Sequence, residues 1–100
     1  MSGSFLFPPL FAIPYRTDAT LARAPSGVLN ARHPLARWLL ANAETLAEAF
    51  PASFEQVFRP LRSVDAINTA LERIARRRPD LAPPPGAYLR QDEKGRWWSR

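Results

Sequence analysis

The chain has 100 residues, the length of one small domain. Its formal net charge is +5, from 14 basic and 9 acidic residues, and it contains no cysteine and a single histidine. These counts exclude disulfides, thiolate metal sites and cysteine nucleophiles, and they leave no His-rich metal site. We therefore predict a non-catalytic protein that uses no cofactor.

The apolar stretches of the chain are short. The longest, residues 5–13, is interrupted by two prolines and is far shorter than the roughly 20 residues of a membrane-spanning helix. It also lacks the basic region and the small-residue cleavage site of a signal peptide. The sequence predicts a soluble cytoplasmic protein without a membrane partner.

Residues 1–33 are predicted to form an extended arm and its connection to the rest of the chain. Three prolines in residues 5–16 exclude a helix interior and a central strand. Large apolar side chains crowd this arm, so we expect it to pack on a partner chain or on the domain's own core. The candidate partner-binding residues in the arm are Phe5, Phe7, Leu10 and Phe11. The connection, residues 17–33, is rich in turn-forming residues, with one helical turn as an alternative near residues 19–23.

Residues 34–78 are predicted to form a core of three helices. The first begins at Pro34, because proline is favourable at the first helical position, and it ends before Pro51. Apolar residues recur every three or four positions along it and form one stripe. They are Leu35, Trp38, Leu39, Ala43, Leu46, Ala47 and Phe50. His33 lies immediately before this helix, and we interpret it as a capping or packing residue rather than as an acid or base.

The second and third helices follow directly. Ser53 and Gln56 have the spacing of a capping box, which starts the second helix at Ser53, and Pro60 is expected to distort or end it. The third helix is predicted to begin with Ser63 as its N-cap and to end before Pro79. Its core face consists of Val64, Ile67, Leu71 and Ile74.

Residues 79–100 are predicted to be a stiff, extended, proline-rich link followed by a β-hairpin. Residues 87–90 and 96–99 flank a turn that contains glycine. A lone hairpin is marginal in water, so either the arm supplies a third strand or the hairpin packs on the helices. We interpret the adjacent Asp92 and Glu93 as solvated residues of the hairpin tip rather than as metal ligands.

The surplus of aromatic residues predicts a protein-binding surface, because aromatic side chains dominate the energetics of interfaces. We expect a protein–protein interaction or accessory module that acts through another protein chain or as a homo-oligomer. Strand alternation places Trp97 and Trp98 on opposite faces of the hairpin, so at least one of them faces the core or a partner. Tyr88 and Trp97 join the arm residues as partner-binding candidates.

The alternative is a small basic protein that binds nucleic acid. Arginines cluster at the end of the third helix, and with those of the hairpin they would build a basic surface on which aromatic rings stack bases. The candidates are Arg76, Arg77, Arg78, Arg90 and Arg96. The competing interpretation is that the three helix arginines complement the helix dipole without any ligand.

Two segments resemble the C-terminal part of Hsp90-like (HtpG-like) ATPases found in bacterial multidomain proteins. They are residues 7–15, Phe-Pro-Pro-Leu-Phe-Ala-Ile-Pro-Tyr, and residues 28–40. Most of the resemblance, which covers residues 7–80, comes from the pattern Leu29-Asn30, His33-Pro34 and Trp38-Leu39. The acidic and Gly-rich ATP-binding motifs of that family do not occur here, so no ATP-binding residue is implied. The resemblance implies a non-catalytic, mostly helical module that acts through another chain or is a piece of a larger one.

Overall fold

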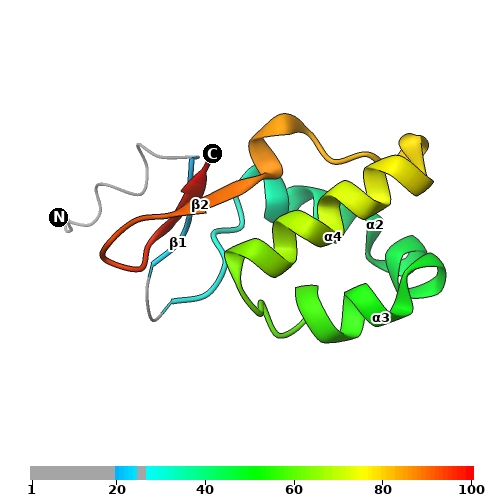
Figure 1. The fold of residues 1–100 in the computed structure, drawn as a ribbon, viewed down its shortest axis with the longest axis horizontal. Coiled ribbons are helices and arrows are strands. Elements are labelled where there is room, and N and C mark those ends of the chain that lie inside the picture. Colours follow the sequence, from blue (N-terminus) through cyan, green and yellow to red (C-terminus); the bar gives the residue numbers. More distant parts are fainter. Residues whose placement is uncertain (1–19, 25–26) are drawn as a thin grey trace, which may run out of the picture.

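Helices and a small sheet occupy different ends of the molecule (Figure 1). The structure is a computed structural model and describes residues 20–24 and 27–100. The longer helices are α2 (Pro34–Ala49) and α4 (Val64–Arg77), and between them α3 (Pro51–Ser53) continues as a π-helical turn, η1 (Phe54–Phe58). The sheet is antiparallel with the strand order β1-β3-β2, and its strands are β1 (Leu21–Arg23), β2 (Leu89–Gln91) and β3 (Trp97–Ser99). This architecture confirms the predicted fold class, which was mainly helical with a C-terminal hairpin.

Helix α2 has the boundaries that its sequence predicts. His33 is the N-cap, and its ring Nδ1 accepts a hydrogen bond of 3.0 Å from the backbone N–H of Leu35. Pro34 follows as the first helical residue, where the N–H that proline lacks would have had no helical partner. The helix ends at its C-cap, Phe50, because Pro51 cannot continue the hydrogen-bond ladder.

The second helix begins two residues before Ser53, so the capping-box prediction is wrong. Pro51 is the first residue of α3, and Ser53 already has helical dihedral angles (φ −63°, ψ −42°) with no capping hydrogen bond from its side chain. The proline decides the start because it both stops α2 and is favourable as the first residue of the next helix. Ser53 is instead buried within the helix, with 7% of its surface exposed.

Pro60 ends this helix, as predicted, through a wide final turn. The backbone N–H of Arg59 donates to the carbonyl of Phe54, five residues earlier, at 2.9 Å, which is the π-helical spacing. Leu61 then has a positive φ of 50°, a conformation more often taken by glycine at a helix end. Its N–H closes the turn by donating to the carbonyl of Phe58 at 3.1 Å. The leucine side chain packs against the core.

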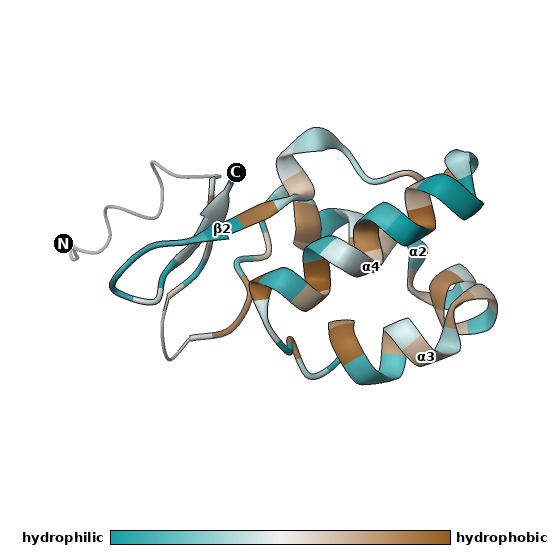
Figure 2. Ribbon diagram, viewed as in Figure 1, coloured by the Kyte–Doolittle hydropathy of each residue, from teal (hydrophilic) through white to brown (hydrophobic). Residues whose placement is uncertain are grey.

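Helix α4 also has its predicted boundaries. Ser63 is the N-cap, and its hydroxyl accepts a hydrogen bond of 3.1 Å from the N–H of Ala66. Arg78 is the C-cap, and Pro79 ends the helix. The predicted core face is confirmed, since each of its residues is at most 8% exposed. Brown and teal bands alternate along α4 in Figure 2, as expected for a helix with one apolar face.

The helices and the sheet enclose one hydrophobic core. The indole of Trp38 meets the ring of Phe58 edge to face, with 5.9 Å between the ring centroids and an angle of 75° between the planes. Ala47 is exposed, so the predicted stripe of α2 is narrower than expected at this position. The sheet contributes Ala22, Leu89 and Trp97 to the same core.

The hairpin packs on the helices, as one of the two predicted alternatives required, and it also gains a third strand, which comes from the connection (residues 17–33) and not from the arm residues 5–16. This strand, β1, pairs with β3, and it lies in residues 21–23, where the helical-turn alternative is therefore wrong. The side-chain amide of Asn68 donates to the carbonyl of Leu89 at 2.9 Å and accepts from its N–H at 2.8 Å. This double hydrogen bond fixes α4 against β2.

The proline-rich link is more folded than predicted. Instead of one extended segment, it forms two 3-10 turns, η2 (Pro79–Leu81) and η3 (Pro85–Ala87). The hydroxyl of Ser99 donates to the carbonyl of Gly86 in η3 at 2.7 Å and lies 2.8 Å from Nε2 of His33. One junction therefore joins the start of α2, the link and β3.

Candidate functional site

Of the predicted partner-binding residues, the structure describes two, Tyr88 and Trp97. Those of the arm, Phe5, Phe7, Leu10 and Phe11, lie outside the described residues. Trp97 is 4% exposed and belongs to the core, so we correct its assignment to an exposed interface. Tyr88 is half-buried, and the guanidinium of Arg100 lies 5.2 Å from the centroid of its ring. Alternation along β3 is as predicted, with Trp97 facing the core and Trp98 the outer face.

An apolar hollow on the described surface lies between α2 and η1. We call it the α2–η1 groove; it has a volume of about 190 Å³. It is lined by Leu39, Leu40, Ala43, Phe54, Phe58 and Arg59. Leu40 is 74% exposed. Arg59 is the only charged residue among the described lining residues, and it forms an ion pair of 3.3 Å with Glu55. The groove therefore offers carbon surface to a ligand, with its one cation already paired.

This groove was not predicted from the sequence, because the helical spacing placed Leu39 in the core stripe of α2. One signal was present in the sequence. Leu40 is apolar but is not among the residues assigned to the core stripe of α2. A helix that buries its stripe leaves such a residue in water, and this is what the structure shows.

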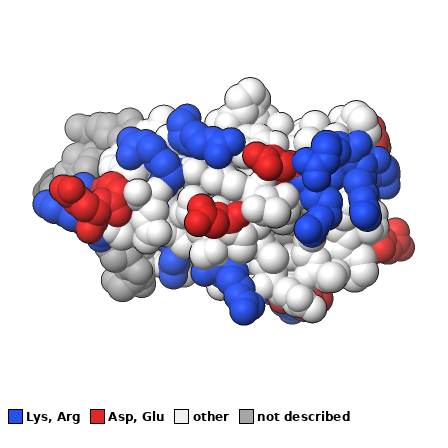
Figure 3. Space-filling view, in the orientation of Figure 1, with Lys and Arg blue, Asp and Glu red and all other residues white. Residues whose placement is uncertain are grey.

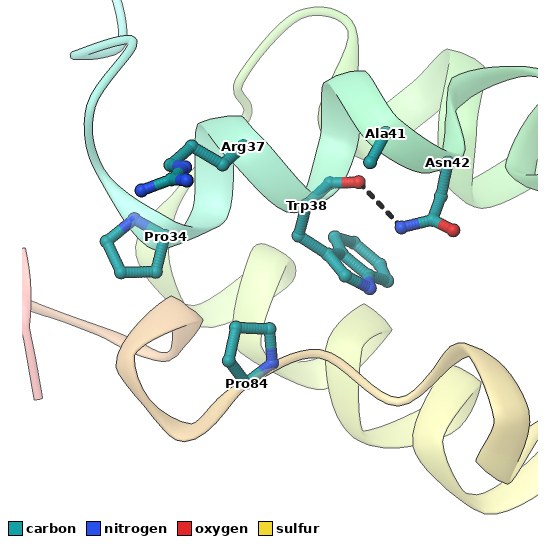
Figure 4. A pocket seen from close by; sticks show the side chains of 6 residues that line it. All are labelled: Pro34, Arg37, Trp38, Ala41, Asn42 and Pro84. Atoms are coloured by element: carbon teal, nitrogen blue, oxygen red, sulfur yellow. Dashed lines mark hydrogen bonds between the residues drawn. The ribbon is translucent and has the colours of Figure 1, made fainter.

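A larger and more polar hollow, of about 510 Å³, lies between α2 and the link (Figure 4). Trp38 and Pro84 face each other across it, and Arg37 is the only charged residue among the described residues that line it. The indole N–H of Trp38 donates to the carbonyl of Leu81 at 3.0 Å, and the amide of Asn42 donates to the carbonyl of Trp38 at 2.8 Å. Because these donors act within the fold, we assign this hollow a structural role.

The outer face of the sheet carries arginines over aromatic rings. The guanidinium groups of Arg90 and Arg96 lie 5.7 and 5.5 Å from the centroid of the Trp98 ring, within the range of cation–π attraction. Together with Tyr88 and Arg100 they form what we call the arginine–aromatic face. The structure thus brings two of the predicted nucleic-acid residues together with an aromatic ring.

One carboxylate organises the hairpin tip beside this face. Asp92 accepts hydrogen bonds from the backbone N–H groups of Lys94 (2.9 Å) and Arg96 (2.9 Å), from the Arg96 guanidinium (2.7 Å) and from the Trp98 indole (2.9 Å). These bonds, the one from Trp98 above all, hold the pKa of its carboxyl well below the usual range. Glu93 is exposed at the tip, as predicted, whereas Asp92 is an internal acceptor that the sequence analysis missed.

The arginines of α4 lie at the other end of the molecule. Figure 3 shows Lys and Arg side chains gathered where α4 ends, whereas the hairpin contacts the N-terminal half of this helix through Asn68. A helix of 14 residues is about 20 Å long, so the predicted basic surface is divided into two patches. Arg78 pairs with Asp80 at 2.8 Å and lowers the pKa of that carboxyl. Within the described residues, Arg76 and Arg77 have no carboxylate partner.

His33 is a structural residue, as the sequence analysis proposed. Its ring is 0% exposed, and burial lowers its pKa to about 4, so it is neutral near pH 7. Nδ1 accepts from the backbone of Leu35, and the hydroxyl of Ser99 donates to Gly86. We therefore assign the ring proton to Nε2, which donates to the Ser99 hydroxyl. Across residues 20–24 and 27–100, no three His, Asp or Glu side chains are grouped so that they could hold a metal ion.

Comparisons with known proteins found no relative that indicates a function. No protein-family model, curated protein or solved structure matches the chain. The resemblance of residues 7–80 to Hsp90-like ATPases therefore stays a prediction from the sequence. None of the helices in the described part of the chain has the length and apolar character needed to span a bilayer.

Proposed function

We propose that this chain is a non-catalytic protein-interaction module whose α2–η1 groove binds an apolar segment of a protein chain. The observation that carries the proposal is Leu40, which is 74% exposed at a hollow lined mainly by carbon. Burying a leucine side chain is worth about 1.5–3 kcal/mol. A partner that covers Leu40 and enters the groove between Leu39 and Phe58 gains this energy.

The groove also indicates the chemistry of its partner. Because Arg59 is paired with Glu55, a bound segment needs apolar side chains here rather than charged ones. Residues 5–11 of this chain are a segment of that kind, rich in Phe and Leu and interrupted by proline. The proposal therefore covers an accessory role on another protein and self-association through the arm.

Leu40→Asp tests the groove, with Val28→Asp as its matched control. Val28 is 85% exposed and does not line the groove, so both substitutions place the same charge at an exposed apolar position. We expect a fluorescein-labelled peptide of residues 4–16 to bind the full chain. Its Kd should rise by about tenfold or more in Leu40→Asp and by less than about twofold in Val28→Asp.

Sedimentation velocity of the same variants completes the test. If the chain self-associates through the groove, Leu40→Asp should lower the mass in solution and Val28→Asp should not. Equal peptide affinities for the two variants would place the binding site elsewhere. A chain that binds no peptide and has the same mass at every concentration would contradict the proposal.

A second candidate function is the binding of single-stranded nucleic acid through the arginine–aromatic face. Proteins that bind single strands combine stacking rings with cations that neutralise phosphates. Trp98 lies beside Arg90 and Arg96 on an exposed sheet surface, and this contact favours the candidate. The ion pair of 2.7 Å between Arg96 and Asp92 opposes it, because the carboxylate neutralises one of the cations.

Salt dependence tests this second candidate. We expect oligo(dT) binding to weaken steeply as salt rises, and Arg90→Gln to reduce both the affinity and the salt slope. Arg76→Gln removes the same charge at the distant end of α4 and serves as the control. Equal effects of the two substitutions would indicate general attraction to a basic protein instead of recognition by the sheet face.

A further inference from the structure

A third hollow lies where α2 meets α3, and the proposed function does not use it. It has a volume of about 410 Å³ and lies between the α2–α3 corner and the C-terminal half of α4. Residues 49–52 form an apolar wall, and Ser53, Arg73 and Arg77 supply its polar groups. The charges and the buried hydroxyl of this hollow indicate what it binds.

The hollow carries two uncompensated positive charges. Arg73 and Arg77 are four residues apart on α4, a spacing that places their side chains on the same face of the helix. Both are exposed, and neither has a carboxylate within ion-pair distance among the described residues. None of the described residues that line the hollow is acidic. An anion that enters it therefore meets two free guanidinium groups.

Ser53 provides an independent indication of a ligand. It is 7% exposed and lines the hollow, yet its hydroxyl forms no hydrogen bond with any residue that the structure describes. Buried hydroxyl groups nearly always have a hydrogen-bond partner. Because α3 starts at Pro51, Ser53 lies inside the helix and not at its capping position.

We propose that this hollow binds a phosphomonoester, with Arg73 and Arg77 pairing with the phosphoryl oxygens and the Ser53 hydroxyl donating to one of them. A phosphomonoester carries a charge of about −1.5 to −2 near pH 7, which matches two guanidinium groups, whereas a carboxylate matches one. The hollow is much larger than a phosphoryl group, and its apolar wall of Phe50 and Pro51 suits the organic part of the ester.

Calorimetric titration of the full chain tests this site, with phenyl phosphate, inorganic phosphate and benzoate as probes. We expect phenyl phosphate to bind more tightly than the other two, because it alone combines a dianion with an apolar ring. Arg73→Gln and Arg77→Gln should each weaken its binding by about tenfold. Arg76→Gln removes the same charge from a residue that does not line the hollow, and its effect should stay below about twofold.

Ser53→Ala separates the site from general electrostatics. It leaves the charge unchanged and removes the hydroxyl, so it should weaken phenyl phosphate severalfold without lowering the thermal midpoint. A phosphotyrosine peptide that binds more tightly than phenyl phosphate would identify a phosphorylated protein segment as the ligand, and equal affinity would identify the ester alone. Benzoate binding as tight as that of phenyl phosphate, or equal losses in Arg76→Gln and Arg77→Gln, would overturn the proposal.

Discussion

Protonation of His33 should destabilise the protein between pH 7 and pH 5. In the fold, Nδ1 accepts a hydrogen bond from the N–H of Leu35, and Nε2 lies 2.8 Å from the Ser99 hydroxyl. A second ring proton would displace the Leu35 donor and would place a charge on a ring that is 0% exposed. Burial accordingly lowers the pKa of His33 from 6.5 to about 4.

The lowered pKa determines both the sign and the size of the effect. The folded chain binds the proton more weakly than the unfolded chain, so the contribution of neutral His33 is complete above pH 6.5 and is lost as the pH falls towards 4. A pKa of 6.5 in the unfolded chain and of about 4 in the folded chain lowers the free energy of unfolding by about 2 kcal/mol between pH 8 and pH 5. Below pH 4 the total loss in the free energy of unfolding approaches about 3 kcal/mol.

Urea unfolding followed by tryptophan fluorescence measures this loss, with His33→Asn as the comparison. Asparagine also caps helices, but it does not titrate. The carboxylates titrate in both proteins, so the difference between the two pH profiles isolates His33. We expect the free energy of unfolding of the native chain to fall by about 2 kcal/mol more than that of His33→Asn between pH 8 and pH 5.

Parallel pH profiles would refute this reasoning. An NMR titration supplies a direct check, since the imidazole signals of folded His33 should stay those of the neutral ring through pH 5. A midpoint near 6.5 in the folded protein would show that the ring is neither buried nor held as the N-cap of α2.

Three further predictions concern the core, the contact between helix and hairpin, and the hairpin tip. Trp38→Ala should lower the free energy of unfolding by about 3–5 kcal/mol in urea, and a loss below about 1 kcal/mol would show that the indole is not packed in the core. Asn68→Leu leaves the N–H and the carbonyl of Leu89 unpaired and should lower the free energy of unfolding by about 2–4 kcal/mol, measured by thermal melts. The control, Asn42→Leu, removes one half-buried hydrogen bond and should lower the free energy of unfolding by less than half as much. In NMR spectra, Asp92→Ala should shift the indole N–H resonance of Trp98, and the control Glu93→Ala should leave it in place. In the native chain the position of this resonance should not change as the pH falls through about 4, because the Asp92 carboxylate stays charged there.

The boundaries of α2 and α4 were predictable because residues adjacent to each helix determine them. Pro34 and Pro51 delimit α2, and Ser63 provides the N-cap of α4. The second helix shows the limit of such local rules. Ser53 and Pro51 are competing start signals two residues apart, and the proline decides the outcome because α2 cannot extend through it.

The sheet was less predictable because its third strand depends on distant residues. Residues 21–23 are too few to show an alternating pattern, and they form a strand because β3 offers them an edge. Alternation separates Trp97 from Trp98, but it does not say which of them is buried. That choice follows from the packing of α4 on β2 through Asn68, which turns the face of Trp97 towards the core.

The candidate sites were least predictable, because they depend on which elements end beside one another. The nucleic-acid candidates were grouped by their shared charge, and α4 separates Arg76 and Arg77 from the arginines of the hairpin. The hollow beside Ser53 arises only because α3 starts at Pro51 and packs its first turn near Arg77. No spacing in the sequence indicates that Ser53 lies close to Arg73 and Arg77.

The separation of the three surfaces allows a lost contact to be distinguished from lost stability. Leu40 on α2, Arg77 on α4 and Trp98 on β3 lie outside the core cluster, and none of them lines a hollow that belongs to another. Substitutions at positions that share no partner have nearly additive effects. A variant of the α2–η1 groove that no longer binds the peptide of residues 4–16 should therefore keep its affinity for phenyl phosphate. Arg77→Gln should bind phenyl phosphate more weakly and keep its affinity for the peptide. If one surface substitution abolishes both activities, the fold itself has been weakened, as Trp38→Ala would weaken it.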